Sequence, residues 1–461
     1  MGDTVCSMTA AATGRELTRL AGPIALTQLA QVALTTSDLV MMGPLGVAAL
    51  AAGGLSITLF NQLRTMGVGL LTSVGNLVSS AAGRAERQQA TGEAAVADVR
   101  DLVRAGLLVA TAAGTVGGLV LVGLGYVLRW FGQDAAVLDD TLPMLVALAP
   151  GLVPCLWFQV IRQFTVGMRK PKALLLITLA SVVVNIVLNA AFAYGPGPLP
   201  ELGLPGIGFA TSVVYLLTFV AFAAMVRSDP ELSPYFSIAM HRAPAAAVRR
   251  ILRLGFPIAG TYGSEAGLFS VTAIVIGTFG APALAAHVVV NQLSYIVFQV
   301  SVGISHAASI LVSRLVELGE TARTRMVAWL AYGQGACVAG VVALVYATIP
   351  ESLLGLFMDT GDRSAVGVAL ALLVVAAFQQ FVDSAQNIGI GLLRGLHDTS
   401  SSLWITLLGY WAVGLPVGLL LAYVADLKTV GMWLGLSAGL TTAAGLLLLT
   451  FRRRLADAIA V

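Results

Sequence analysis

The sequence has little charge and almost no cysteine. Only 11% of its 461 residues are Asp, Glu, Lys or Arg, and 57% are hydrophobic, whereas an average soluble domain carries about 25% charged residues. A chain with so few charges excludes a disordered protein and disfavours a soluble enzyme, because it cannot cover a water-soluble globule of this size. Cys6, Cys155 and Cys337 are widely spaced and odd in number, which excludes a disulfide framework and a CxxC metal or redox motif.

The sequence also lacks the motifs of nucleic-acid binding and of cofactor chemistry. Its net charge of +3 is spread over short stretches between apolar runs, so no nucleic-acid partner is expected. No Walker, GxGxxG, zinc or catalytic-triad pattern stands in a suitable context, which disfavours an ATP-driven pump and predicts no organic cofactor. His397 and Asp398 are the only adjacent His/Asp pair, and they lie in a predicted loop, so a membrane-embedded enzyme is the less favoured alternative.

Long apolar runs dominate the chain. A membrane-spanning helix needs about 20 apolar residues, and twelve continuous Ala/Leu/Val-rich runs meet this requirement, without the short alternating segments of a β-barrel. The first run is too long and too polar for a signal peptide. We therefore predict an all-α integral membrane protein with twelve transmembrane helices. The runs lie near residues 20–43, 50–78, 102–128, 142–165, 173–194, 207–226, 251–279, 284–312, 326–349, 366–393, 401–425 and 430–450.

Basic residues lie mainly in alternate gaps between the runs. Of the 26 Lys and Arg residues, 22 fall at the two termini or in every second gap, with Arg162 assigned to the gap after the fourth run. Arg129, Arg363 and Lys428 fall on the other side, and Arg64 lies within a run. By the positive-inside rule, this distribution predicts a multi-pass protein with both termini in the cytoplasm.

The longest polar interruption falls after six runs and contains three prolines. It divides the chain into an N-terminal six-helix lobe (1–226), a cytoplasmic linker (227–250) and a C-terminal six-helix lobe (251–461). Because six is an even number, both lobes keep the same orientation in the membrane. We expect a pseudo-twofold axis along the membrane normal, with a binding site between the lobes near mid-membrane.

An internal repeat supports this division. Sliding Pro23–Ala52 by 234 positions onto Pro257–Ala286 gives 11 identities in 30 positions. A weaker repeat aligns Gly167–Pro171 with Gly395–Thr399, each after the fourth run of its half. Pro23 and Pro257 stand at matching places within runs, where a proline makes either a static kink or a bend that moves during gating.

Three carboxylates lie deep inside the runs: Asp38, Glu265 and Asp383. Insertion of an Asp, Lys or Arg near a helix centre costs about 2.5–3.5 kcal/mol, so such residues are functional by default. For all three, helix packing or an ion pair with Arg64 is the alternative explanation. Each acid shares a helical face with other polar residues: Asp38 with Gln28, Gln31 and Thr35, Glu265 with Thr261 and Thr272, and Asp383 with Gln380 and Asn387.

Further polar residues in other runs predict a hydrated cavity. Asn61 and Arg64 lie in the second run, Asn185 and Asn189 in the fifth, and Asn291 in the eighth. Interhelical hydrogen bonding is the alternative role for the two asparagines of the fifth run. Partial desolvation favours the protonated form of a carboxyl group, so an acid in such a cavity exchanges a proton, holds a monovalent cation such as Na⁺ or pairs with an organic cation.

Several segments together resemble the multidrug and toxic compound extrusion (MATE) transporters, in particular their NorM-like branch. They are the stretch from Gly22 through Asp38 to MMGPLGVAALAAGGLS, GFPIAG at Gly255 and GLLRGLHDT at Gly391. In that branch one acidic residue lies in each of the first, seventh and tenth helices, which match Asp38, Glu265 and Asp383 here. Gln379 stands where some sodium-coupled members have an aromatic ring.

The resemblance implies a secondary transporter, not an enzyme, in a bacterial cytoplasmic (inner) membrane. It would export cationic or amphiphilic drug-like molecules by alternating access, in exchange for H⁺ or Na⁺. We expect the protein to be a monomer. In this scheme Glu265 and Asp383 bind the coupling ion together with Asp38, and the other polar residues line the cavity. The alternative within transport is an exporter or flippase of a lipid-linked or natural-product amphiphile.

Overall fold

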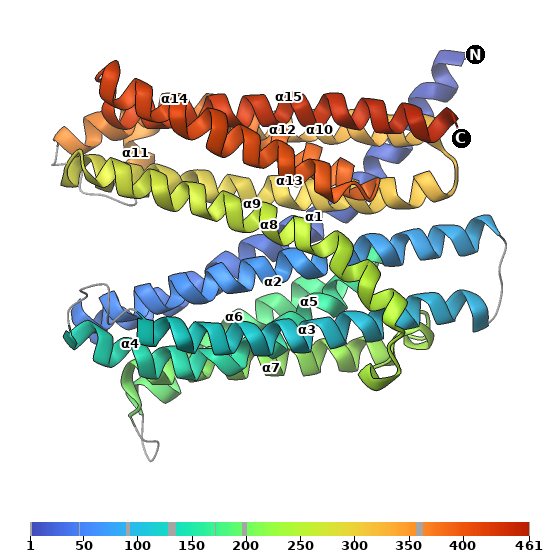
Figure 1. The fold of residues 1–461 in the computed structure, drawn as a ribbon, viewed down its shortest axis with the longest axis horizontal. Helices are drawn as coiled ribbons and strands as arrows, with labels where there is room; N and C mark the ends of the chain where they lie inside the picture. The colour runs from blue at the N-terminus through green and yellow to red at the C-terminus, as the bar shows by residue number, and fades with distance from the viewer. Residues whose placement is uncertain are drawn as a thin grey trace. The chain divides into compact units, whose positions relative to one another are not determined.

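The computed structural model is helical throughout its regular structure (Figure 1). Twelve long helical segments are present in the described part of the chain, six before the linker and six after it, which confirms the predicted all-α membrane fold. Ten of them are long and apolar enough to cross a membrane by composition alone. The other two are α2 and α8. The structure describes residues 2–45, 47–88, 93–127, 135–170, 172–195, 201–355 and 363–460.

The bounds of the segments are close to the apolar runs, although several helices extend beyond them. The fourth segment is interrupted at Pro150 by a 3₁₀ turn, η3 (Ala149–Gly151), and the eleventh contains two π-helical stretches. The first six are α1 (Gly2–Met42), α2 (Val47–Arg87), α3 (Glu93–Val127), α4 with α5 (Ala135–Leu148, Leu152–Gly167), α6 (Lys172–Tyr194) and α7 (Gly203–Ser228). The others are α8 (Ala245–Gly277), α9 (Ala281–Glu317), α10 (Thr321–Thr348) with the short α11 (Pro350–Leu354), α12 (Arg363–Gly395), α13 with α14 (Thr399–Leu407, Leu415–Leu419) and α15 (Lys428–Ala460).

The chain forms two compact units, and the boundaries between them fall inside helices α1 and α8. Unit 1 combines Met1–Ala25 with Gly260–Val461, and unit 2 is Leu26–Ala259. The first part of α1 therefore packs with the later helices, and the first part of α8 packs with the earlier ones. The lobe boundaries at residues 226 and 251 stay a prediction from the sequence. The compact units of the structure are instead divided after Ala25 and after Ala259.

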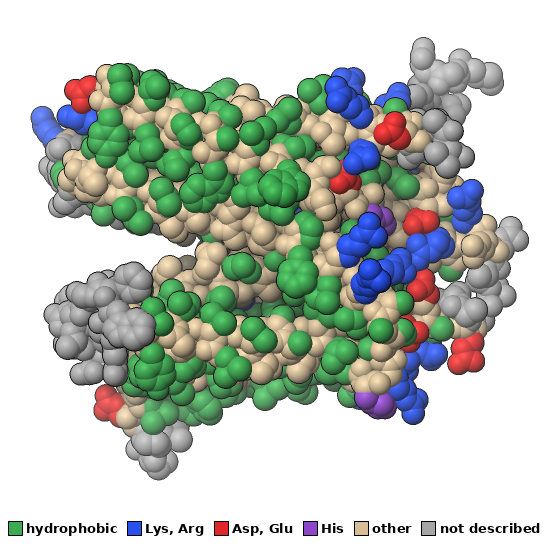
Figure 2. Space-filling model, in the orientation of Figure 1, with side chains coloured by type: hydrophobic (Ala, Val, Ile, Leu, Met, Phe, Trp, Pro, Cys, Tyr) green, Lys and Arg blue, Asp and Glu red, His purple; other side chains and the backbone are tan. Residues whose placement is uncertain are grey.

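Each unit has an apolar interior and an apolar exterior. Trp433 and Leu372 lie in the core of unit 1, and Met42 and Leu145 in that of unit 2, all at 2% exposure or less. Figure 2 shows hydrophobic side chains along the helices and most of the visible Lys and Arg side chains toward their ends. Such a surface would aggregate in water and is suited to lipid.

The weaker sequence repeat is also a repeat of backbone structure. Arg169 and His397 end their helices in the left-handed region, with φ of 62° and 61°. The next residue donates its backbone N–H five positions back in both cases, Lys170 to Thr165 at 2.8 Å and Asp398 to Leu393 at 2.9 Å. The two helices thus terminate in the same capping motif.

The linker folds onto unit 2. Between Ser228 and Ala245 it contains two 3₁₀ turns, η4 (Ser233–Tyr235) and η5 (Met240–Arg242). The turns pack against α3, and Arg104 of α3 donates a hydrogen bond from Nε to Ser237 Oγ at 3.0 Å.

Candidate ion-coupling sites

In unit 2, Asp38 is enclosed by hydrogen-bond donors from two other helices. Asn189 Nδ2 of α6 donates to its Oδ1 at 2.7 Å, and Thr211 Oγ1 of α7 donates to its Oδ2 at 3.2 Å. The carboxylate lies on α1 and is only 3% exposed. Both oxygens are therefore solvated by protein groups, which lowers the cost of burying the charge. Thr211 was not predicted, since no charged residue near it in the sequence marks it.

The network around Asp38 continues to Asn185. Asn185 Oδ1 accepts from Ser37 Oγ at 2.7 Å and from Asn189 Nδ2 at 3.3 Å. Within the described residues, Asn185 Nδ2 and Asn189 Oδ1 are buried without a hydrogen-bond partner. A buried donor and a buried acceptor left unmet are costly, so they mark a place where a ligand or water molecule would be stabilised.

Gln28 and Gln31 belong to a different cluster, centred on Arg162. The guanidinium donates to Gln28 Oε1 at 2.5 Å, and at 3.5 Å to Gln31 Oε1 and Gln159 Oε1. Arg162 lies inside α5 and is 2% exposed, so its assignment to a loop was wrong. The prediction failed because Arg162 stands close to the end of its run. The amide oxygens of α1 turn toward this buried charge rather than toward Asp38, and the side chain of Thr35 lies outside the described residues.

Asn61 and Arg64 interact with each other on α2. Arg64 Nε donates to Asn61 Oδ1 at 3.1 Å, one helical turn away, and both residues are half-buried. They lie in unit 2, as do Asp38 and Arg162.

In unit 1, Glu265 of α8 and Asp383 of α12 form a buried pair of acids. Each is 9% exposed, and their charges repel each other. No side chain in the described ranges donates a hydrogen bond to Glu265, while Asp383 Oδ1 accepts one long bond, from Asn387 Nδ2 at 3.5 Å. Among the described residues no group of three or more His, Cys, Asp or Glu side chains is arranged to hold a metal ion.

The turn of α12 that carries Asp383 is held by its neighbours. Asn387 O accepts from Ser305 Oγ of α9 at 2.7 Å, and Gln386 Nε2 donates to Tyr410 Oη at 2.7 Å. Tyr410, which was not predicted, is 1% exposed and interacts electrostatically with Glu265 and Asp383. Only the tertiary structure identifies it, since it lies in a largely apolar run.

The remaining predicted residues of unit 1 have different environments. Gln380 is 3% exposed on α12, and Asn291 is half-buried on α9. His287, also on α9 but not among these predicted residues, is packed, and its Nδ1 accepts from Trp433 Nε1 at 3.1 Å.

Pro23 and Pro257 lie within helices, each next to the divide between the compact units. The divide in α1 falls after Ala25 and that in α8 after Ala259, two residues beyond each proline. A proline inside a helix removes a backbone hydrogen bond and permits bending. The two prolines therefore stand where each helix passes from one unit to the other.

A sequence model of one protein family matches this chain twice. The family is MatE, and the matches cover residues 23–191 and 257–420. They begin at Pro23 and Pro257, the same 234-residue offset that relates the two halves of the sequence.

Bacterial relatives align with nearly the whole chain. A probable multidrug resistance protein NorM of Pseudomonas aeruginosa is 36% identical over 95% of this chain and 88% of its own length. A protein of the same description from Bradyrhizobium diazoefficiens is 37% identical over 95% of this chain and 92% of its own. Among solved structures, the eukaryotic MATE transporter AtDTX14 superposes with a TM-score of 0.85 at 19% identity, over 98% of this chain and 99% of its own. This likeness concerns the fold.

Proposed function

The chain belongs to the MatE family and is a multi-pass membrane transporter rather than an enzyme, and from this premise we propose that it is a secondary antiporter. It exports organic cations or drug-like molecules in exchange for H⁺ or Na⁺. The names of its bacterial relatives, which describe multidrug resistance, support this class of substrate. The distribution of basic residues supports placement in the bacterial inner membrane with both termini cytoplasmic.

The observation that carries the proposal is the pair Glu265 and Asp383. Two buried carboxylates that repel each other and accept few hydrogen bonds are costly as two negative charges. A proton, a sodium ion or an organic cation removes that cost. Because these cations compete for the same charge, binding of one favours release of another, which is the requirement for exchange.

Exchange also requires that the coupling ion bind two conformations with different affinity. Bending of α1 and α8 at Pro23 and Pro257 would change the surroundings of the acids as the units move. In this proposal Asp38, with Asn185 and Asn189, forms a second polar site in unit 2. The buried unmet donor and acceptor of the two asparagines support a role in binding cargo.

Dye efflux from proteoliposomes tests the proposal. Gradients of pH and of sodium are imposed separately, and Glu265→Gln and Asp383→Asn are compared with the parent. Ser384→Ala is the matched control, because this neighbour of Asp383 on α12 has a buried hydroxyl without a hydrogen-bond partner in the described structure. We expect gradient-driven efflux to persist in the control and to be lost in both acid variants.

Undiminished efflux in both acid variants would refute the role of the pair. The gradient that drives efflux in the parent identifies the coupling ion. If cationic dyes are not moved but a lipid-linked amphiphile is, the alternative function as a flippase or amphiphile exporter replaces the proposal.

A further inference from the structure

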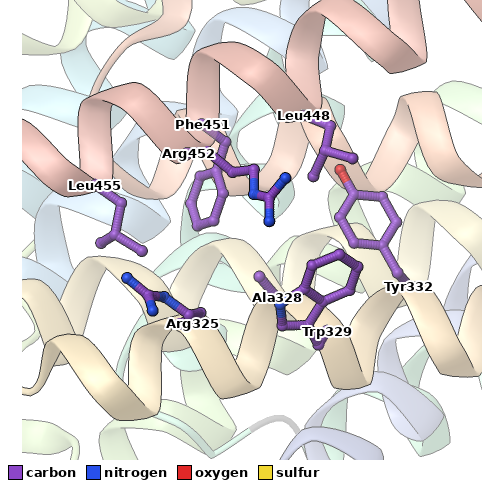
Figure 3. A pocket seen from close by; sticks show the side chains of 8 residues that line it. All are labelled: Arg325, Ala328, Trp329, Tyr332, Leu448, Phe451, Arg452 and Leu455. Atoms are coloured by element: carbon purple, nitrogen blue, oxygen red, sulfur yellow. The ribbon is translucent and has the colours of Figure 1, made fainter.

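A cavity of about 250 Å³ opens between α10 and α15, within unit 1 and away from the buried acids (Figure 3). Arg325, Trp329 and Tyr332 of α10 line one side, and Phe451 and Arg452 of α15 line the other. α12 packs against both helices. The cavity is therefore a groove with two helical walls, one guanidinium on each wall and aromatic rings between them.

The two guanidiniums of the groove have no acidic partner in the described part of the chain, unlike their neighbours. Arg323 forms an ion pair with a glutamate of α1 at 3.1 Å, and Arg454 pairs with an aspartate at 2.8 Å. Arg325 and Arg452 lie two residues from these paired arginines and form no such ion pair. Their positive charge is thus left for an external anion.

Aromatic contact holds one of these charges in place. The Cζ atom of Arg452 lies 5.8 Å from the ring centroid of Trp329, which is a cation–π contact. This contact uses the face of the guanidinium, so the N–H donors in its plane stay available for hydrogen bonds to an anion. Trp329 is 52% exposed and Leu448 of α15 is half-buried, so both offer apolar surface to a ligand, whereas Phe451 and Leu455 are covered by the protein itself. The groove therefore combines cations at its mouth with an apolar wall, and tryptophan is typical of the membrane–water interface.

The inner end of the groove contains an unmet hydrogen-bonding group. The hydroxyl of Tyr332 is buried and has no hydrogen-bond partner among the described residues. It faces α12 at Gly389, where a Cβ atom would lie 3.3 Å from this oxygen. The hydroxyl is thus available to an ester or phosphate oxygen that enters the groove.

We propose that this groove binds an anionic phospholipid, with its phosphate held by the guanidiniums that line it, Arg325 and Arg452, and its acyl chains along Trp329 and Leu448. The paired positive charges disfavour the organic cations assigned to the transport site. The apolar wall gives a lipid an advantage over inorganic phosphate, since acyl chains bury apolar surface there. The basic ends of α10 and α15 are where positively charged residues meet the anionic leaflet.

Lipid retention by the purified full-length protein tests this proposal. The protein is equilibrated in detergent with phosphatidylglycerol or phosphatidylcholine, and bound lipid is counted by native mass spectrometry. We expect Arg325→Gln and Arg452→Gln each to weaken phosphatidylglycerol binding about fivefold, the effect of one basic residue near an anionic surface. Arg453→Gln is the matched control, because it removes the same charge from an exposed position beside the groove without lining it.

A second variant and the parent protein keep the test decisive. Ala328→Phe places a ring in the groove at a residue that is 4% exposed, keeps both arginines and should also displace the lipid. In the parent, phosphatidylglycerol should be retained over phosphatidylcholine and should raise the apparent Tm, whereas inorganic phosphate should not. Equal retention of the two lipids by the parent, or loss of binding in Arg453→Gln equal to that in Arg452→Gln, would overturn the proposal.

Discussion

Asp38 in unit 2 and the pair Glu265 and Asp383 in unit 1 are all buried, but the protein solvates them in different ways. Asp38 accepts hydrogen bonds on both oxygens, at 2.7 and 3.2 Å. Asp383 accepts one at 3.5 Å, and none of the described side chains donates to Glu265. Side chains therefore solvate Asp38 better than they solvate Glu265 and Asp383, which repel each other.

This difference separates two tasks that both need a buried carboxylate. A carboxylate whose two oxygens accept hydrogen bonds from fixed side chains is already partly stabilised, so it gains less from a bound cation. A poorly solvated pair gains much more from a bound cation, so its occupancy responds to the ion gradient. In the proposed antiporter, unit 1 senses the coupling ion and unit 2 contributes a polar site for cargo.

The largest effect is expected from the acid pair. Asp383→Asn removes the charge that repels Glu265, so binding of a cation no longer distinguishes the conformations. Coupling between two binding sites is worth about 1–3 kcal/mol, so its loss should remove an effect of about 5- to 150-fold of the imposed gradient on substrate affinity, and gradient-driven efflux should be lost. Initial rates under imposed gradients measure this. Exchange that is independent of the gradient but otherwise intact would confirm uncoupling, and an unchanged dependence on the gradient would contradict it.

A smaller effect is expected for Asp38→Asn. The amide keeps the shape of the carboxylate, but its N–H₂ group replaces one of the two acceptor oxygens. That group then faces the donor of either Asn189 or Thr211, and one hydrogen bond is lost. Loss of one charge-assisted hydrogen bond costs about 1.5–3 kcal/mol, so substrate binding should weaken by about tenfold while ion dependence remains. Substrate titration of efflux separates the two parameters. Thr211→Val is the control that removes only the longer bond, and a greater loss in this control than in Asp38→Asn would contradict the comparison.

The cluster around Arg162 should affect stability more than transport. Arg162→Met removes the buried charge but leaves the amide oxygens of Gln28, Gln31 and Gln159 without this donor. Loss of the donor to a buried acceptor such as Gln159 Oε1 costs about 1–3 kcal/mol, so the apparent Tm in detergent should fall clearly. Arg169→Met, an exposed arginine after the same helix, is the control. A fall in transport without a fall in Tm would assign Arg162 to the transport site instead.

The sequence predicted the helices well because bilayer thickness and the cost of buried charge act on every run alike. It also assigned Asp38, Asn185 and Asn189 to one group of cavity residues, and these three side chains lie in one hydrogen-bonded network. Helical spacing shows which residues share a face, but it does not show which neighbouring helix that face meets. For this reason Gln31 was grouped with Asp38 rather than with Arg162. The divide of the compact units inside α1 and α8 depends on tertiary packing, which no local pattern reports.

The smallest effect concerns the repeated helix ends, where the two units are most alike. A Cβ atom on Gly167 would lie 2.7 Å from Gly75 O of α2, and one on Gly395 would lie 2.9 Å from Ser309 O of α9. The two residues contacted, Gly75 and Ser309, are 234 positions apart, which is the offset of the internal repeat. Gly167→Ala and Gly395→Ala should therefore destabilise their units similarly, by about 1 kcal/mol from overpacking.

The apparent Tm of each single variant measures this pair of effects. Gly123→Ala is the control, because a Cβ atom there would meet nothing within 4 Å. Since the two glycines lie in different compact units, their effects should add in the double variant. A large fall for one glycine and none for the other would show that the repeated backbone contact is not energetically equivalent in the two units.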